Sequence, residues 1–267
     1  MTEALLIDRQ GGVDYVTLNR PDKLNALSPD MIDALLSYFE SLYRQRDTRI
    51  VVLKANGRGF CAGLDMTPGV EYGEDYGRQG AKRSYVIQQR ISDIYRAMRK
   101  SPQPIISLIH GAACGGGFSL ALASDIRIAA DNVKMNAAYI KIGLTGCDMG
   151  SSYFLPRLVG ASKAAELILT GRFIYAEEAL ASNLVSQIVP VDQLLEAAKP
   201  IIEAMLATTP MGLRLSKQAL NMAIDAPSLE SALATEDRHQ ALLTLTEDHL
   251  EAVNAFQEKR VPVYKDQ

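Results

Sequence analysis

The stretch from Pro104 to Ala130 constrains the fold most strongly, because it carries almost no charge and yet cannot form one long helix. A membrane-spanning helix needs about 20 unbroken apolar residues, whereas His110, Asp125 and a cluster of glycines interrupt this run. The pattern instead predicts a buried strand over 104–109, a turn, a short buried helix and a second buried strand over 125–129. Because buried parallel strands read as continuous apolar runs, we expect an α/β protein.

Strands and helices alternate through the first part of the chain, and only helices follow. The expected elements are strands at 5–8, 13–19, 50–55 and 184–189, and helices at about 28–44, 81–100, 148–159, 162–169 and 176–181. Everything from Val191 onward is expected to be helical, with breaks near Pro210 and Pro227. This order indicates a core over residues 1–195 and a C-terminal helical region over 196–267.

Apolar side chains recur along the C-terminal helices, at Leu213, Leu220, Leu242, Leu245, Leu250 and Phe256. Two interpretations stay open at this point. The side chains pack on the protein's own core, or they form an interface between subunits.

The overall composition argues against several classes of function. Hydrophobic residues make up 48% and charged residues 22% of the chain, and a net charge of −3 gives no global attraction for nucleic acid or an anionic membrane. The three cysteines are an odd number without metal-ligand spacing, which indicates a reducing compartment and no disulfide framework. We therefore expect a cytoplasmic protein, and the charged start MTEALLIDRQ is unlike a signal peptide.

Two glycine-rich segments carry the strongest chemical signal: GRGFCAGLDM over 57–66 and HGAACGGGFS over 110–119. Backbone N–H donors need close approach and little side-chain bulk. A glycine triplet at the start of a helix supplies both, together with the positive end of the helix dipole. Two such donors on one carbonyl oxygen can hold the negative charge that develops there, and each is worth about 3 kcal/mol in comparable sites. The triplet alone would suit a tight turn without a ligand; beside the first segment, an oxyanion hole is favoured.

Several linked motifs then occur in a fixed order: NRPDKLNAL, the two segments above, LVGASKAAELILTGR, LVSQIVP and FQEKRVPVY. Over essentially the whole chain they resemble the crotonase (enoyl-CoA hydratase/isomerase) superfamily. The resemblance implies a spiral of β-β-α units with a C-terminal helical trimerisation region, and thus a homotrimer or hexamer. It also implies an acyl-CoA substrate, with coenzyme A present only as part of the thioester and no metal or other cofactor.

The same resemblance assigns a binding site. It implies that the N–H groups of Leu64 and Gly116 hold the thioester oxygen. Coenzyme A would lie along two segments, at Lys23, Leu24 and Ala26 and at Ala62, Leu64, Asp65 and Met66. Phe256 and Lys259 resemble residues that reach the nucleotide part, sometimes that of a neighbouring subunit.

The reacting side departs from the usual hydratase pattern. Two glutamates handle water in family hydratases, and their positions fall on Ser119 and Tyr139 in this chain. A serine hydroxyl is a poor base, and so is a tyrosine with an ordinary pKa of about 10. Ser119 is similar to the serine of the feruloyl-CoA hydratase-lyase branch, although that branch keeps the second glutamate.

Asp148 is the remaining carboxylate in the right neighbourhood. It resembles the aspartate that attacks the ring in 4-chlorobenzoyl-CoA dehalogenase, and the dienoyl-CoA isomerase branch has a catalytic aspartate nearby. That dehalogenase also uses a histidine from the preceding helix, where this chain holds Ser92 and no histidine. The structural alternative for Asp148 is a helix N-cap, a position that aspartate fills readily.

These features predict an acyl-CoA-processing enzyme, with enoyl-CoA hydratase or isomerase as the best description. Leu64 and Gly116 would hold the enolate oxygen, while Asp148, Ser119 and Tyr139 would line the reacting side. One alternative is an isomerase, dehalogenase or hydrolase that uses Asp148. Another is a non-catalytic relative that binds acyl-CoA, or one that binds RNA through the basic helix at Arg96, Arg99 and Lys100, although the charge balance does not favour nucleic acid.

Overall fold

A six-stranded sheet forms the centre of the computed structural model, which describes residues 3–72 and 80–267. The strand order is β1-β2-β3-β4-β6-β9, with bounds β1 Leu5–Gln10, β2 Val13–Leu18, β3 Ile50–Ala55, β4 Ile105–Ile109, β6 Ile126–Ala130 and β9 Gln187–Val189. Only β1 and β2 pair antiparallel, and each later neighbour is parallel. The predicted α/β class is confirmed.

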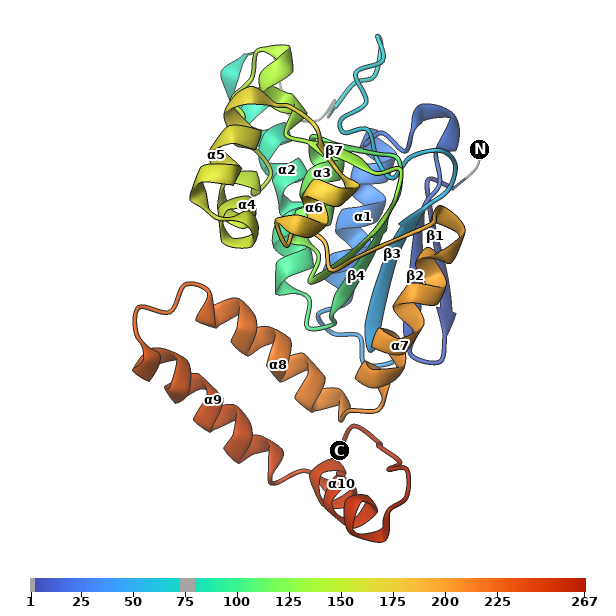
Figure 1. Cartoon of the computed structure of the whole chain (residues 1–267), viewed down its shortest axis with the longest axis vertical. Coiled ribbons are helices and arrows are strands. Elements are labelled where there is room, and N and C mark those ends of the chain that lie inside the picture. Colours follow the sequence, from blue (N-terminus) through green and yellow to red (C-terminus); the bar gives the residue numbers. More distant parts are fainter. Residues whose placement is uncertain (1–2, 73–79) are drawn as a thin grey trace.

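Both faces of this sheet are buried, which explains the continuous apolar runs of its strands. Side chains alternate between faces along a strand, so Val51 and Leu53 of β3 join the larger core while Ile50 and Val52 join the smaller one. The larger core contains the buried faces of α1 (Pro29–Ser41), α2 (Ala81–Lys100) and α3 (Gly116–Ala123). The smaller core is closed by Leu194, Ala198 and Ile202 of α7 (Leu194–Leu206). Figure 1 shows these helices on opposite sides of the sheet.

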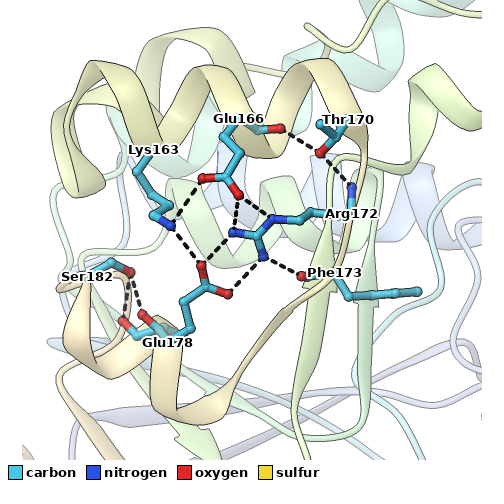
Figure 2. A network of polar contacts seen from close by, with 8 residues as sticks. Lys163, Glu166, Thr170, Arg172, Phe173, Glu178 and Ser182 are labelled. Carbon is cyan, nitrogen blue, oxygen red and sulfur yellow. Dashed lines mark hydrogen bonds and ion pairs between the residues drawn. The ribbon is translucent and has the colours of Figure 1, made fainter.

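A second sheet of order β5-β7-β8 carries the next layer. Its strands are β5 Ala112–Cys114, β7 Lys134–Asn136 and β8 Ile174–Tyr175, and the helices that follow or flank it are α4 Ser151–Val159, α5 Ala161–Thr170 and α6 Ala176–Ala181. Figure 2 shows how α5 and α6 are tied together: Arg172 and Lys163 both bind Glu166 and Glu178. This ion-pair network lies outside the segments that form the candidate site.

The C-terminal helices α8 (Pro210–Ala223), α9 (Leu229–Leu243) and α10 (Glu247–Glu258) project away from the sheet (Figure 1). Of the apolar side chains singled out there, only Leu213 packs against the core. The others are largely exposed in the single chain: Leu220, Leu242, Leu245, Leu250 and Phe256. The interpretation that the whole set packs on the protein's own core is therefore wrong, except at Leu213.

Most of the predicted elements occur, with shifted ends. Ser28 caps α1 as expected, since its side chain accepts a bond from Met31 N–H. The helix predicted over 148–159 begins only at Ser151, and residues 261–267 are not helical. Across the described ranges, the structure has no helix long and apolar enough to cross a membrane.

Candidate active site

The two glycine-rich segments meet at the start of α3. Cys61 forms a parallel bridge with Ala113, and Leu64 forms one with Leu27. The Cys114 N–H donates to Cys61 O at 2.9 Å, which reinforces the first bridge. Segments about 50 residues apart in the sequence are thus joined backbone to backbone.

Glycines allow this close approach. A β-carbon at Gly117 would lie 2.1 Å from Cys61 O, and one at Gly63 would lie 2.9 Å from Cys114 O. Gly63 also has a φ of +98°, and Gly115, just before α3, has a φ of +51°. Residues with a β-carbon rarely adopt these angles, so the contact between the two segments depends on glycine.

The N–H groups of Leu64 and Gly116 have no acceptor within the described part of the chain. In the bridge, Leu27 N–H donates to Gly63 O at 2.8 Å and Asp65 N–H donates to Leu27 O at 3.1 Å, which leaves the Leu64 N–H unused. Gly116 begins α3, and the first N–H groups of a helix lack intrahelical acceptors. Since a β-carbon at Gly63 would lie 3.6 Å from Gly116 N, the two free donors belong to adjoining backbone.

Buried side chains surround Gly116. A β-carbon there would lie 2.7 Å from Leu27 Cδ1 and 3.1 Å from both Met149 Sδ and Tyr95 Oη. The Tyr95 hydroxyl donates to Gly116 O at 3.0 Å. Burial raises the pKa of Tyr95 well above its ordinary value, so this phenol stays neutral. Tyr95 thus holds the carbonyl of Gly116, whose own N–H is free. The sequence alone did not single out this tyrosine.

Ser119 and Tyr139 meet inside the protein. Ser119 lies on α3 and Tyr139 in the 3-10 helix Ala138–Ile142, and their hydroxyl oxygens are 2.6 Å apart. Burial raises the pKa of Tyr139 far above its ordinary value, and the nearby charge of Asp148 adds to this shift. The hydroxyls of Ser119 and Tyr139 are therefore hydrogen-bonded neighbours, and neither carries a negative charge at neutral pH.

Asp148 lies in the loop before α4, and the N-cap interpretation is wrong. The N-cap of α4 is Gly150, and no side chain caps this helix. The Oδ1 atom of Asp148 instead accepts from Met149 N–H at 2.7 Å and from Gln88 Nε2 at 2.5 Å. Two further hydrogen bonds between Asp148 and Ser151 hold the loop. Ser151 N–H donates to Asp148 O at 2.9 Å, and Ser151 Oγ accepts from Asp148 N–H at 3.1 Å.

The carboxyl of Asp148 is half-buried, and burial raises its pKa, while the bonds from Met149 and Gln88 act in the opposite direction. Its charge contributes to the raised pKa of Tyr95 and Tyr139, and the Sδ atom of the adjacent Met149 lies 3.1 Å from the Tyr95 hydroxyl. A carboxylate whose pKa is moved toward neutrality is a stronger base than an exposed one. Met149 therefore links the two features, because its N–H binds the Asp148 carboxyl and its Sδ lies against Gly116.

The two segments expected to hold coenzyme A lie side by side. Ala62 N–H donates to Leu24 O at 3.0 Å, and the buried Asn25 joins the same loops because its Nδ2 donates to Gly59 O at 2.9 Å. Lys23 is exposed beside them. The structure therefore brings together the segments that were predicted separately.

Asp65 organises this loop. Arg20 donates to Asp65 Oδ2 at 2.9 Å and to Ala26 O at 2.6 Å, and Thr67 N–H donates to Asp65 Oδ1 at 3.1 Å. The bonds from Thr67 lower the pKa of Asp65, although burial opposes them, and Arg20 lowers it further. Met66, the next residue, is exposed. The sequence analysis did not identify Arg20 as a residue of this loop, although it lies inside the NRPDKLNAL motif that indicated the loop.

Phe256 and Lys259 are not brought to this site. Phe256 lies on α10 and is 84% exposed, and Lys259 is exposed at the end of the same helix. Figure 1 shows α10 at the far end of the molecule from α4 and α5. Within one chain these two residues therefore do not contact the segments described above.

Cys61 and His110, two reactive residue types within the glycine-rich segments, are both buried. Burial raises the pKa of Cys61 to about 12, so its thiol is not an ionised nucleophile at neutral pH. His110 Nε2 lies 2.9 Å from Gly57 O at the end of its strand. Over residues 3–72 and 80–267 no cluster of His, Cys, Asp or Glu side chains could hold a metal ion. In the acidic loop after Met66, Glu71 is exposed, and Glu74 and Asp75 lie outside the described residues.

Two of the basic side chains of α2 form ion pairs with aspartates. Arg96 binds Asp93 at 2.5 Å and Arg99 binds Asp125 at 3.3 Å. Each pair reduces the positive charge that the helix offers to an outside anion.

The chain matches the family described as enoyl-CoA hydratase/isomerase over residues 8–267. It belongs to this family. A probable enoyl-CoA hydratase of Mycobacterium tuberculosis is 38% identical over 262 residues, covering 95% of this chain and 90% of that protein. A 1,2-epoxyphenylacetyl-CoA isomerase of Escherichia coli is 33% identical over 264 residues and covers 99% of each chain.

Solved structures agree with this assignment. The crystal structure of an enoyl-CoA hydratase from Bacillus anthracis superimposes with a TM-score of 0.90 at 32% identity, covering 99% of this chain and 100% of that one. The fold is therefore the crotonase fold, and the protein is an acyl-CoA-processing enzyme of the hydratase/isomerase family.

Proposed function

We propose that this enzyme stabilises a thioester enolate between the N–H groups of Leu64 and Gly116. The observation that carries the proposal is that both donors are free and belong to adjoining backbone, held by glycines and by the Leu27 bridge. Fixed donors need no reorganisation when charge develops on the oxygen. The acyl group would then lie against Leu27, Tyr95 and Met149.

The reacting side favours a proton shift, with Asp148 as the base. In a 3-enoyl thioester, the Asp148 carboxylate takes a proton from the α-carbon, and the C–H electron pair becomes the dienolate whose charge lies on the thioester oxygen. The protonated Asp148 then returns this proton to the γ-carbon, which moves the double bond next to the carbonyl. One carboxylate is sufficient for this reaction, and the neutral Ser119–Tyr139 pair contributes hydrogen bonds rather than charge.

Hydration is the second candidate function, because the relatives above include proteins named as enoyl-CoA hydratases. Water addition to a 2-enoyl thioester would place the water near the hydroxyls of Ser119 and Tyr139. As the water oxygen bonds to the β-carbon, Asp148 would take a proton from it and then return that proton to the α-carbon of the enolate. Two carboxylates share this work in the usual family pattern, so we expect hydration to be slower than the proton shift.

We propose that coenzyme A lies along Lys23, Leu24, Ala26, Ala62 and Met66, with Asp65 holding the loop. Phe256 and Lys259 would reach the nucleotide of a neighbouring copy, which requires a homotrimer or hexamer built through the helical region 196–267. The exposed apolar side chains of α8 to α10 support such an assembly. The free cysteines fit a cytoplasmic location.

The test combines one turnover assay with one binding measurement. A 3-enoyl-CoA and a 2-enoyl-CoA are supplied separately, and absorbance of the conjugated thioester is followed; it rises for the proton shift and falls for hydration. Release of halide or of free coenzyme A from suitable esters would instead indicate dehalogenation or hydrolysis. If the protein binds these esters but converts none of them, it is a non-catalytic relative that binds acyl-CoA.

The infrared carbonyl frequency of a bound, isotope-labelled thioester tests the oxyanion hole directly. We expect it to fall relative to water, and to fall less in Gly116→Ala, because the new β-carbon must displace Leu27 Cδ1 at 2.7 Å. An unshifted carbonyl in the unmodified enzyme would exclude the assignment of Leu64 and Gly116.

A further inference from the structure

Among the described residues, Gln88 is the one whose side chain donates to the carboxyl of Asp148. It lies on α2, and its Nε2 donates to Asp148 Oδ1 at 2.5 Å. Residues three and seven positions apart share a face of a helix, so Gln88 lies on the same side of α2 as the buried Ile91 and Tyr95. The face that packs into the core therefore also delivers an amide to the candidate base.

Both donors bind the same carboxylate oxygen. Met149 N–H reaches Oδ1 at 2.7 Å from the adjacent residue, in a left-handed conformation with a φ of +49°. Oδ2 accepts no hydrogen bond from any described residue. A carboxylate held in this way has one oxygen fixed and the other available as a proton acceptor.

We infer that Gln88 is a positioning residue: its amide fixes Oδ1 of Asp148 and directs proton transfer to Oδ2. The inference rests on the proposed role of Asp148 as the base. A glutamine amide can donate only from its nitrogen, and an ionised carboxylate only accepts, so this bond exists at full strength only while Asp148 is ionised. Gln88 therefore keeps the base ionised in a half-buried site as well as orienting it.

The variant Gln88→Met removes the donor and keeps most of the side-chain volume. Carboxyl chemical shifts of Asp148, followed against pH by carbon NMR in the free enzyme, report its pKa without any substrate. We expect this pKa to rise in Gln88→Met and to rise further in Gln88→Glu, because two adjacent carboxylates resist ionising together. Gln89→Met, at the exposed neighbouring position of the same helix, is the matched control and should leave the titration unchanged.

Kinetics supply the second readout. We expect kcat of Gln88→Met to fall about tenfold, a part of the full effect of a general base. The acid limb of its pH profile should move to higher pH, with KM little changed. Gln88→Glu should show the same limb displaced further in the same direction.

The outcomes separate this inference from the proposed function. If Asp148→Asn abolishes turnover while Gln88→Met leaves both the titration and kcat unchanged, the positioning role is wrong and the base assignment stands. If Gln88→Met raises the pKa of Asp148 but Asp148→Asn is fully active, the base assignment fails. In that case the hydrogen bond is purely structural, and the positioning role in proton transfer fails with it.

Discussion

The α/β body and the C-terminal helices are stabilised in different ways. The body buries both faces of its sheet, with side chains such as Val51 and Ile50 fully enclosed. The region of α8 to α10 leaves large apolar side chains in solvent, among them Leu245 in the turn between α9 and α10 and Phe256 on α10, each 84% exposed. The body therefore completes its hydrophobic core within one chain, whereas the helical region leaves apolar side chains exposed in the single chain.

Polar contacts hold α8 against the α/β body. Lys217 of α8 is buried, and its Nζ donates to Gln103 O at 2.8 Å and binds Asp125 at 2.9 Å. Arg214 of the same helix pairs with Asp266 at 2.6 Å. Lys217 thus ties α8 to the body, and Arg214 ties it to the C-terminal residues, while Leu213 is the side chain named above that adds an apolar contact with the core.

The largest effect is expected at the glycine contact inside the body. Gly117→Ala places a β-carbon 2.1 Å from Cys61 O, so backbone must move, and we expect a loss of about 4 kcal/mol in the free energy of unfolding. Gly69→Ala is the control, because nothing lies within 4 Å of its β-carbon. It should cost only the about 1 kcal/mol of a left-handed backbone. Urea unfolding of both variants checks this, and equal losses would show that the close contact is not what the body depends on.

The next effect concerns the attachment of α8. Lys217→Met removes the buried cation from Asp125 and leaves backbone carbonyls unpaired, so we expect a loss of about 3 kcal/mol. Hydrogen exchange should show the loosening first in α8 and not in the central sheet. Lys199→Met, which removes an exposed pair with Glu196, should change stability by less than about 0.5 kcal/mol. Uniform loosening of the whole protein would contradict the contrast between the two regions.

The third effect is chemical and should leave both regions folded. Asp148→Asn keeps the shape of the side chain but removes the base, so we expect turnover to fall about a hundredfold, equivalent to about 2.7 kcal/mol. The measurement is kcat/KM on the preferred enoyl-CoA, together with the thermal midpoint. Asp131→Asn, at an exposed position, controls for the loss of a carboxylate. A fall of less than threefold would remove Asp148 from the reaction.

The fourth prediction tests whether the exposed apolar side chains of the helical region form an interface between subunits. The double variant Leu245→Asp/Phe256→Asp should weaken self-association at least tenfold, equivalent to about 1.4 kcal/mol, without changing the unfolding of the body. Sedimentation equilibrium measures this directly. Gln257→Asp changes an exposed polar residue next to Phe256 on α10. It should not alter the number of subunits. If the double variant assembles normally, the exposed side chains do not form the interface.

The smallest effect is expected from the network in Figure 2. The bonds from Arg172 and Lys163 lower the pKa of Glu178 to about 2 from an ordinary 4.5. A lowered folded-state pKa stabilises the protein above about pH 4.5, and this contribution is lost as the pH falls toward 2. Because the pair is a third exposed, we expect less than about 1 kcal/mol. Comparing Glu178→Gln with the unmodified protein at pH 7 and pH 3 checks the sign: the difference should shrink at the lower pH.

The sequence was informative wherever local chemistry fixes the backbone. Ser28 and Pro29 marked the start of α1, and the glycine triplet marked the start of α3, as the structure shows. The sequence left Asp148 open between a reacting carboxylate and a helix N-cap, because an aspartate before a helix is an equally good cap by composition alone. The structure excludes the cap, because Gly150 is the N-cap of α4 and the Asp148 carboxyl instead binds Met149 and Gln88. Gln88 itself gave no signal, since a glutamine on a helix is ordinary until its partner is known.

The sequence by itself determined the family, the order of the elements and the two segments with close backbone contact, because glycine spacing and apolar periodicity act over a few residues. Tertiary structure alone decided which groups meet. It paired Ser119 with Tyr139, placed Gln88 on Asp148, and left Leu245 and Phe256 outside the core. These outcomes depend on contacts between residues far apart in the chain and on burial, which shifts the pKa of each group, and neither can be read from local sequence.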